Sequence, residues 1–229
     1  MLTTIFQPEG QQLVWMEPVG IGFFDCDAHN AALGAGHVYD DDYFANYQGL
    51  AESPIAKALN DYRAGLVTRH ALVGGMHGQS QCSLLDVGIG DGAFLRRVDE
   101  FKAWLEPFGC DVNPAGVAWL VERGQLSGFE EPASFDMVTF WDSLEHIRDP
   151  RPALAAARHV AIVSLPVFTS AEHAIASKHF KPREHFWYFT RHGFCQFADR
   201  EGFDVVDVLA TESALGREEI ETFVLKRRP

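Results

Sequence analysis

The fold of this 229-residue chain is decided by the stretch Leu84-Leu85-Asp86-Val87-Gly88-Ile89-Gly90-Asp91-Gly92-Ala93-Phe94-Leu95. An apolar run ends at an acid, three alternating glycines follow, and a helix-like pattern then begins. This order predicts a strand, a tight turn and a helix. Because glycine has no Cβ and tolerates positive φ, such a turn can pass close to a ligand. The unpaired N–H groups at the start of the helix add to that expectation.

On either side of this stretch, strand-like and helix-like segments alternate. Strands are predicted over residues 82–87, 106–111, 135–141, 160–165, 203–208 and 221–225, and helices over 92–104, 113–123, 152–157 and 190–200. The alternation is typical of an α/β fold, here a Rossmann-like, doubly wound, mainly parallel sheet with α-helices on both faces. The last two strands are expected to pair as a hairpin and to add a final antiparallel strand. Ligands of such sheets bind beyond the carboxyl ends of the strands, where the strand order reverses.

Residues 1–80 are expected to form an N-terminal extension with helices that cover the site, ahead of a domain over residues 81–229. Short strands are predicted at 12–16 and 20–24, and a helix at 39–47. Ser53-Pro54 is a helix start, because an N-cap precedes a proline at the first helical position. Gly74-Gly75 is expected to end that helix.

The composition restricts the partners of the protein. Nineteen Lys and Arg stand against 32 Asp and Glu, which gives a net charge of −13. Duplex nucleic acid is not an expected partner, since phosphate binding needs clustered cations. The four cysteines form no C-x-x-C pair and suit a reduced cytoplasmic protein. Neither a signal peptide nor an apolar run of about 20 residues is visible, so no membrane association is expected.

Two acids frame the glycine turn and point to a particular cofactor. Asp111 follows Gly92 by 19 residues, the usual distance for an acid that accepts hydrogen bonds from a ribose. The run 88–93 also fits the dinucleotide pattern G-x-G-x-x-G/A, which keeps an NAD-dependent oxidoreductase as an alternative. Asp86, however, would repel a pyrophosphate and attract an ammonium group. S-adenosylmethionine carries an amino acid tail and a ribose but no phosphate. A glycine turn with no ligand is the structural alternative.

Three segments, taken in order, resemble class I S-adenosylmethionine-dependent methyltransferases. Residues 84–92 resemble the first motif of the family, and residues 109–114 resemble the second. Residues 134–150 resemble a subgroup in which the fourth strand runs into a D-x-L-E-H turn, here residues 142–146. The resemblance extends over roughly residues 82–225. It implies S-adenosylmethionine as cofactor and S-adenosylhomocysteine as product.

The resemblance also implies which residues contact the cofactor. The first acid and the backbone of the glycine turn would hold the methionine end, the second acid the ribose, and the next residue the adenine. A tryptophan after the fourth strand would flank the methionine moiety, and a tyrosine on a preceding helix would cover the cofactor. These candidates are Tyr43, Asp86, Gly88, Gly90, Asp111, Val112 and Trp141. The segment 124–133 departs from the family, because no strand is visible where a third strand and an acidic adenine contact belong.

Asp142, His146 and His185 are the candidate catalytic residues. An imidazole that titrates near neutral pH can act as a general base, and a structural histidine is the alternative. Asp142, Glu145 and His146 could also hold a divalent metal, which some related methyltransferases do, with a fourth ligand from His173, His179 or His185. We do not favour a metal, since relatives without metal share the pattern. The long segment 166–189, which contains His185, is expected to be a lid or binding loop, with aromatic packing as the alternative.

The sequence therefore predicts S-adenosylmethionine-dependent methyl transfer to a small-molecule, sugar-like or nucleotide-like acceptor. Two further alternatives share the cofactor: a catalytically silent binding module and a methyltransferase that acts on nucleic acid. The methyl group already sits on a sulfonium, so the protein mainly has to align an acceptor with it and exclude water. The acceptor atom and the oligomeric state stay open.

Overall fold

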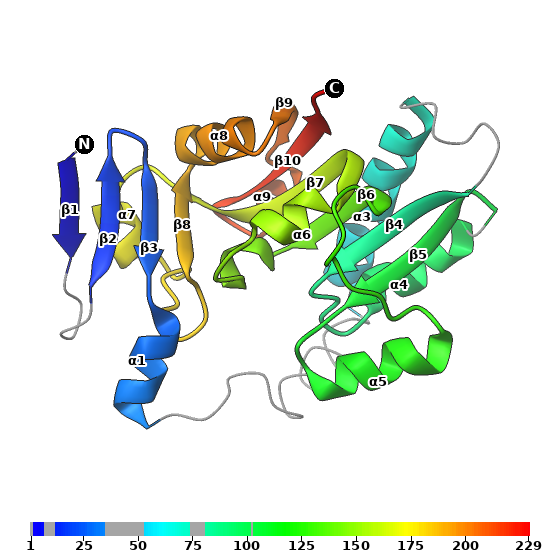
Figure 1. Ribbon diagram of the computed structural model, residues 1–229, viewed down its shortest axis with the longest axis horizontal. Coiled ribbons are helices and arrows are strands. Elements are labelled where there is room, and N and C mark those ends of the chain that lie inside the picture. The colour runs from blue at the N-terminus through cyan, green and yellow to red at the C-terminus, as the bar shows by residue number, and fades with distance from the viewer. Residues whose placement is uncertain (1, 7–11, 35–52, 74–80, 102) are drawn as a thin grey trace.

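A computed structural model describes residues 2–6, 12–34, 53–73, 81–101 and 103–229 of the chain (Figure 1). Within these residues the strands are β1 (Leu2–Phe6), β2 (Leu13–Glu17), β3 (Ile21–Phe24), β4 (Cys82–Val87), β5 (Leu105–Cys110), β6 (Phe135–Trp141), β7 (Ala157–Phe168), β8 (Trp187–Thr190), β9 (Phe203–Leu209) and β10 (Ile220–Arg227). The α-helices are α1 (Cys26–Leu33), α3 (Pro54–Val73), α4 (Ala93–Val98), α5 (Pro114–Arg123), α6 (Arg151–Ala155), α7 (Ala171–Ala176), α8 (Arg191–Arg200) and α9 (Thr211–Ala214). Two 3₁₀ turns are η2 (Asp99–Phe101) and η3 (Leu144–His146).

The predicted Rossmann-like sheet is confirmed in the part that runs β5-β4-β6-β7-β10-β9. β5, β4, β6 and β7 are parallel, whereas β10 is antiparallel to β7 on one side and to β9 on the other. β4 lies between β5 and β6. The chain passes from β4 to β5 on one side and then crosses to β6 on the other side. The strand order therefore reverses at the carboxyl end of β4, where the glycine turn begins.

The N-terminal strands extend this sheet at its far edge. β1, β2 and β3 form an antiparallel run, and β3 pairs with β8. β8 joins the run to the last two residues of β7 in parallel register. Figure 1 shows β1 and β5 at opposite ends of the molecule. The predicted strands at 12–16 and 20–24 are thus present, while the predicted helix at 39–47 lies outside the described residues. The division at residue 80 stays a prediction.

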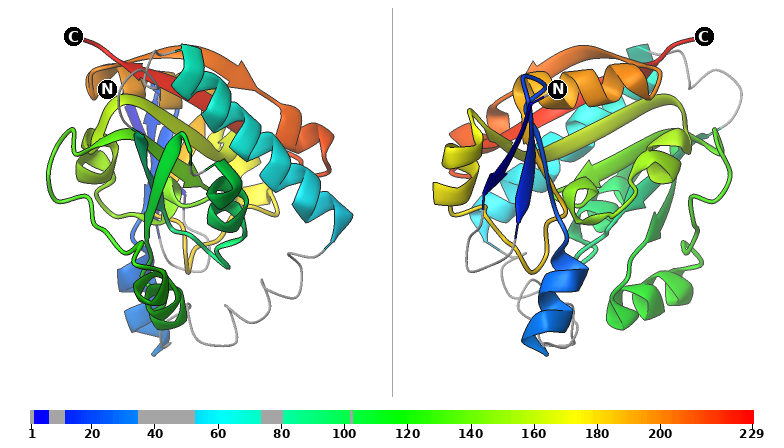
Figure 2. Two further views of the ribbon diagram at one scale, coloured as in Figure 1. Left: turned by 90° about the vertical axis from the view of Figure 1, so that its right-hand side faces the viewer. Right: turned by 60° about the vertical axis from the view of Figure 1, so that its left-hand side comes forward.

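Both faces of the central sheet are buried, which explains its continuous apolar strands. Leu85, Val138 and Val163 face α6 and α8, whereas their neighbours Leu84 and Met137 face α3 and α4. Successive side chains of a strand point to opposite faces, so one apolar run supplies two cores. Figure 2 shows α3 running across one face of the sheet.

Two predicted elements differ by several residues in length from those observed. The helix expected over 92–104 ends at Val98 and continues only as a 3₁₀ turn to Phe101. Trp104 lies beyond this turn, and its carbonyl accepts a hydrogen bond of 2.8 Å from the N–H of Cys82 at the start of β4, which ties it to the sheet. The strand expected over 160–165 is twelve residues long. It is lengthened by its pairing with β6, β10 and β8.

The third strand of the family is reduced to a single parallel bridge between Gly109 and Leu126. Two backbone hydrogen bonds hold it: Gly109 N–H donates to Gln125 O at 2.9 Å, and Ser127 N–H donates to Gly109 O at 3.0 Å. The segment 124–133 has two glycines, a proline and no β-branched residue, a composition that disfavours a strand. The strand that is missing from the sequence pattern is therefore reduced to this one bridge in the sheet as well.

Candidate active site

A cavity of about 850 Å³ opens beyond the carboxyl ends of β4, β5 and β6. It is lined by nine of the predicted site residues: Asp86, Gly88, Gly90, Asp111, Val112, Trp141, Asp142, His146 and His185. The tenth, Tyr43, lies outside the described residues. The fold therefore gathers segments that are up to about a hundred residues apart in the sequence at the switch point of the sheet.

The glycine turn adopts a backbone that only glycine takes up readily. Gly88 and Gly90 have φ values of +79° and +56°. A Cβ on Gly88 would lie 2.7 Å from the Cβ of Ser143, whereas a Cβ on Gly90 would meet open space. The N–H of Gly90 donates to the Asp111 carboxylate at 3.1 Å. The first glycine thus allows close packing with the turn after β6, and the second leaves room toward the cavity.

The two predicted acids sit differently. Asp86 is buried, and one of its oxygens accepts a hydrogen bond of 2.7 Å from the Thr139 hydroxyl. Burial raises the pKa of Asp86 to about 7. Asp111 accepts hydrogen bonds from the N–H groups of Gly90 and Asn113, the latter at 2.8 Å. Burial also raises the pKa of Asp111, although these N–H groups oppose the shift. Asp86 is therefore the acid with the greater need of a cationic partner.

Four charged groups form a network behind the end of β6. Arg63 of α3 donates to both oxygens of Glu212 at 2.9 Å and lies 3.4 Å from Asp142. Arg217 contacts Asp142 at 2.7 Å and also Glu212. The guanidinium of Arg63 stacks 4.7 Å from the ring of Trp141. Burial alone would raise the pKa of Asp142, but Arg217 and Arg63 outweigh it and lower that pKa.

This network bears on the candidate catalytic residue Asp142. A carboxylate held by two guanidinium groups is a poor proton acceptor, which is consistent with an imidazole as the candidate base of the site. Its backbone has a φ of +55°, which is rare for a residue with a side chain and is kept by the surrounding contacts. Arg63, Glu212 and Arg217 were missed in the sequence because nothing in their local patterns links α3 to the segment before β10.

Glu145, His146 and His185 form a second cluster in the cavity. One ligand atom from each lies within 4.8 Å of the other two. The rings of His146 and His185 meet edge to face with centroids 4.4 Å apart. Burial raises the pKa of Glu145 well above its usual value, and Asp142 adds to the shift. Burial lowers the pKa of His146 to about 4 and that of His185 well below its usual range.

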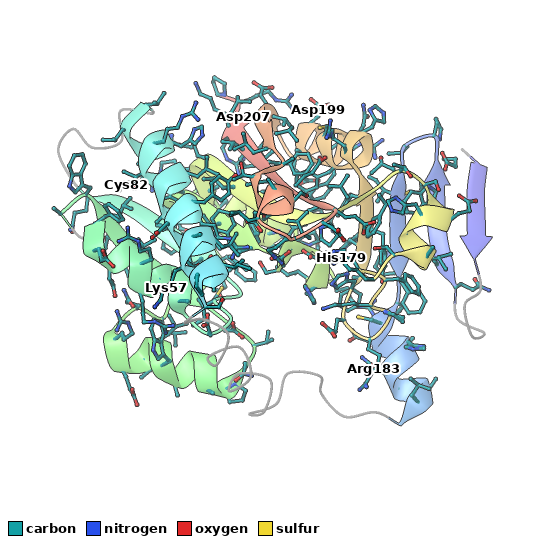
Figure 3. All side chains as sticks on the ribbon, turned by 180° about the vertical axis from the view of Figure 1, so that it is seen from behind. Lys57, Cys82, His179, Arg183, Asp199 and Asp207 are labelled. Atoms are coloured by element: carbon teal, nitrogen blue, oxygen red, sulfur yellow. The ribbon has the colours of Figure 1, made fainter. Side chains whose placement is uncertain are left out.

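Segment 166–189 contributes to the cavity wall, as the sequence led us to expect. Lys178, His179, Lys181 and His185 line the cavity, and the segment contains α7 and β8. Figure 3 shows His179 in the interval between these two elements. Lys178 pairs with Glu218 at 3.0 Å. Several residues of this interval thus face the cavity, although the aromatic residues 186–189 pack into the apolar cores.

The family assignment rests on a match to the family model described as a methyltransferase domain, over residues 43–208. The match covers more than half of the chain. This protein belongs to the methyltransferase-domain family. The match confirms the predicted assignment as a methyltransferase and favours it over the oxidoreductase alternative.

Solved structures show the same fold at low sequence identity. Magnesium protoporphyrin IX methyltransferase from Synechocystis PCC 6803, with bound S-adenosylhomocysteine, has a TM-score of 0.58 at 13% identity over 83% of this chain and 96% of its own. A 1,6-didemethyltoxoflavin-N1-methyltransferase from Burkholderia thailandensis has a TM-score of 0.55 at 14% identity over 100% of both chains. The [4+2]-cyclase SpnF has a TM-score of 0.55 at 15% identity over 88% of this chain and 91% of its own. No curated protein matches the chain.

Among the described helices, none has the length and apolar character needed to cross a bilayer.

Proposed function

We propose that this methyltransferase transfers the methyl group of S-adenosylmethionine to a small-molecule acceptor, sugar-like or nucleotide-like, bound in the same cavity as the cofactor. The observation that carries the proposal is the joint lining of one cavity by the glycine turn, its two acids and the histidine pair. Its volume of about 850 Å³ lies within the range of small-molecule sites. Cofactor and acceptor are therefore expected to lie side by side.

The cofactor end is assigned to the turn after β4 and the residues after β5. Asp86 faces the cavity from a buried position and would hold the ammonium group of the methionine tail, next to the N–H groups of the turn. Asp111 keeps acceptor capacity beyond its two backbone hydrogen bonds and would bind the ribose hydroxyls. Val112 is 79% exposed at the cavity wall and would pack on the adenine.

The acceptor end is assigned to the D-x-L-E-H turn and to His185. Trp141 and Asp142 lie at the junction, where they would separate the methionine moiety from the acceptor. The lowered pKa values leave His146 and His185 neutral near pH 7, so each can accept a hydrogen bond or a proton. In the reaction, a lone pair of the acceptor forms a bond to the methyl carbon as the S–CH₃ bond breaks, and S-adenosylhomocysteine leaves. Alignment and exclusion of water are the main tasks of the protein.

Three considerations support a small acceptor over a nucleic acid. The net charge of −13 opposes binding of a phosphate backbone. Two fold neighbours are named as methyltransferases of small molecules, magnesium protoporphyrin IX and 1,6-didemethyltoxoflavin. The described cations of the cavity wall are mostly engaged by acids: Arg63 and Arg217 by Glu212, and Lys178 by Glu218. We also propose a cytoplasmic location, which suits four cysteines that are all free.

Calorimetry with S-adenosylhomocysteine tests the cofactor end. The Asp111→Asn variant should bind about tenfold more weakly, because a carboxylate hydrogen bond to ribose is replaced by an amide contact. Asp149→Asn is the control, since among the described residues Asp149 pairs with its neighbour Arg151 on the surface. Equal affinities for the two variants would contradict the assignment of Asp111.

Transfer of labelled methyl groups tests the acceptor. Small sugar-like and nucleotide-like compounds should take up label, and duplex DNA should not. Binding of the cofactor without transfer to any compound of the panel would favour the catalytically silent module. Transfer to nucleic acid alone would overturn the small-acceptor assignment.

A further inference from the structure

We propose that Glu145, His146 and His185 bind one divalent transition-metal ion at the acceptor end of the cavity. A carboxylate oxygen and two imidazole nitrogens from these residues lie within 4.8 Å of one another. Two of the residues come from η3 after β6, and the third comes from the segment before β8. Atoms at such separations can reach a common ion at about 2.0–2.2 Å through small rotations of the side chains.

The carboxylate is the strongest reason to place a cation here. Glu145 is 1% exposed, and neither of its oxygens has a hydrogen-bond partner among the described residues. The Nδ1 atom of His185, which is 3% exposed, also lacks a partner among them. A buried polar group without a partner costs about 1–3 kcal/mol, and a carboxylate costs more. One cation would satisfy all of these atoms at once.

The remaining sides of the two imidazoles are already anchored. A backbone hydrogen bond at Glu184 acts on His146, and one at His179 acts on His185. Metal-bound histidines usually donate their second ring N–H to such a group, which fixes the orientation of the ring. The rings therefore have the outer support that a metal site needs, and one nitrogen of each ring belongs to the group of ligand atoms that lie together.

The structure changes the ligand set that the sequence suggested. The D-x-x-E-H pattern placed Asp142 among the possible ligands, but Arg217 and Arg63 both contact its Oδ2, and Asp142 is not among the residues whose ligand atoms lie together. His173 is also engaged, at 2.7 Å, by Glu219. His185, 39 residues after His146, takes the vacant place. The sequence pattern did not favour a metal, because relatives without metal share it. The fold adds a separate argument, since it brings together one ligand atom from each of three residues.

The donor atoms select the kind of ion. Two nitrogens and one oxygen suit Mn²⁺, Fe²⁺, Co²⁺ or Zn²⁺, whereas Mg²⁺ and Ca²⁺ prefer oxygen ligands. Three protein ligands leave coordination positions open toward the cavity, as in catalytic metal sites. An oxygen or nitrogen of the acceptor would take one of them, a step that rests on the proposed function. In that arrangement the histidines orient the acceptor through the ion and do not accept its proton.

The experiment is a titration of chelator-treated protein, without a histidine tag and without S-adenosylmethionine, with Mn²⁺, Zn²⁺ and Mg²⁺. Wild type should bind one Mn²⁺ or Zn²⁺ per chain, with Mg²⁺ at least tenfold weaker. Glu145→Gln and His185→Gln should each lower the Zn²⁺ affinity at least tenfold. His192→Gln is the matched control, because His192 lies on the exposed face of α8. Affinity for S-adenosylhomocysteine is measured on every variant and should stay within about threefold of wild type.

A second measurement on wild type alone keeps the test decisive if a variant does not fold. Bound Co²⁺ should give visible absorption of nitrogen and oxygen coordination, without the thiolate band that any of the four cysteines would produce. Absence of stoichiometric binding, a thiolate band, or unchanged affinity in folded Glu145→Gln and His185→Gln would each overturn the proposal. Failure to bind S-adenosylhomocysteine with metal binding intact would instead contradict the proposed function.

Discussion

The two ends of the cavity are built by different means. At the cofactor end, main-chain geometry does most of the work: a strand, a glycine turn and an N–H group that holds Asp111. At the acceptor end, side chains from remote segments meet, and a four-charge network from α3, α9 and the loop before β10 holds them from behind. The cofactor end therefore depends on the positions of glycines, and the acceptor end depends on contacts between side chains. A local motif can therefore specify the first end, whereas only the complete fold specifies the second.

The largest effect is expected from the charge network. Glu212 is fully buried and accepts hydrogen bonds from Arg63, Arg217 and Ser164. In Glu212→Gln, Asp142 is the one carboxylate among the described residues that still pairs with the two guanidinium groups. Loss of one member of a buried pair costs about 3–5 kcal/mol. Urea unfolding should show a loss of that size in the free energy of unfolding.

A surface pair provides the comparison for this variant. Glu218→Gln removes the partner of Lys178 at an exposed position and should cost less than about 1 kcal/mol. Equal losses for Glu212→Gln and Glu218→Gln would show that the acceptor end does not depend on its buried network.

The second effect concerns the glycine turn. Gly88→Ala forces a side chain into the left-handed region and brings its Cβ to 2.7 Å from the Cβ of Ser143. Strain and overpacking together should lower the free energy of unfolding by about 3 kcal/mol, and cofactor affinity should fall with it. Thermal unfolding and calorimetry measure the two effects.

Gly34→Ala separates the two causes. Gly34 also has a positive φ, +61°, but a Cβ there would meet nothing within 4 Å. Its substitution should cost only about 1 kcal/mol, which is the conformational part alone. If both variants lose the same stability, the close approach to Ser143 contributes nothing to the turn.

The same difference explains what the sequence could predict. The strands, the glycine turn and the two acids were predicted because each depends on residues that are adjacent or at a fixed spacing, and the gap at 124–133 was visible as a missing pattern. His185 was proposed for the site, but its contact with His146 depends on the path of the chain through α7. The network of Arg63, Glu212 and Arg217 has no local pattern, because charged residues on α3 and α9 read as surface positions until the fold buries them.

The smallest effect, and the one that separates the two ends most directly, is a pH dependence of cofactor binding. Burial raises the pKa of Asp86 to about 7, so part of the carboxyl is protonated at neutral pH. The ammonium group of the cofactor needs the ionised form, and binding should strengthen as pH rises through 7, by about tenfold between pH 6 and pH 8. Without cofactor the sign reverses: a raised folded pKa contributes stability below the unfolded value that is lost as pH rises toward 7. His146, with a pKa of about 4, stays neutral across this window. Calorimetry at the two pH values should therefore show the dependence in wild type and His146→Gln, and Asp86→Asn should lack it. A dependence that survives in Asp86→Asn would show that another group titrates, and would contradict the pairing of Asp86 with the ammonium group.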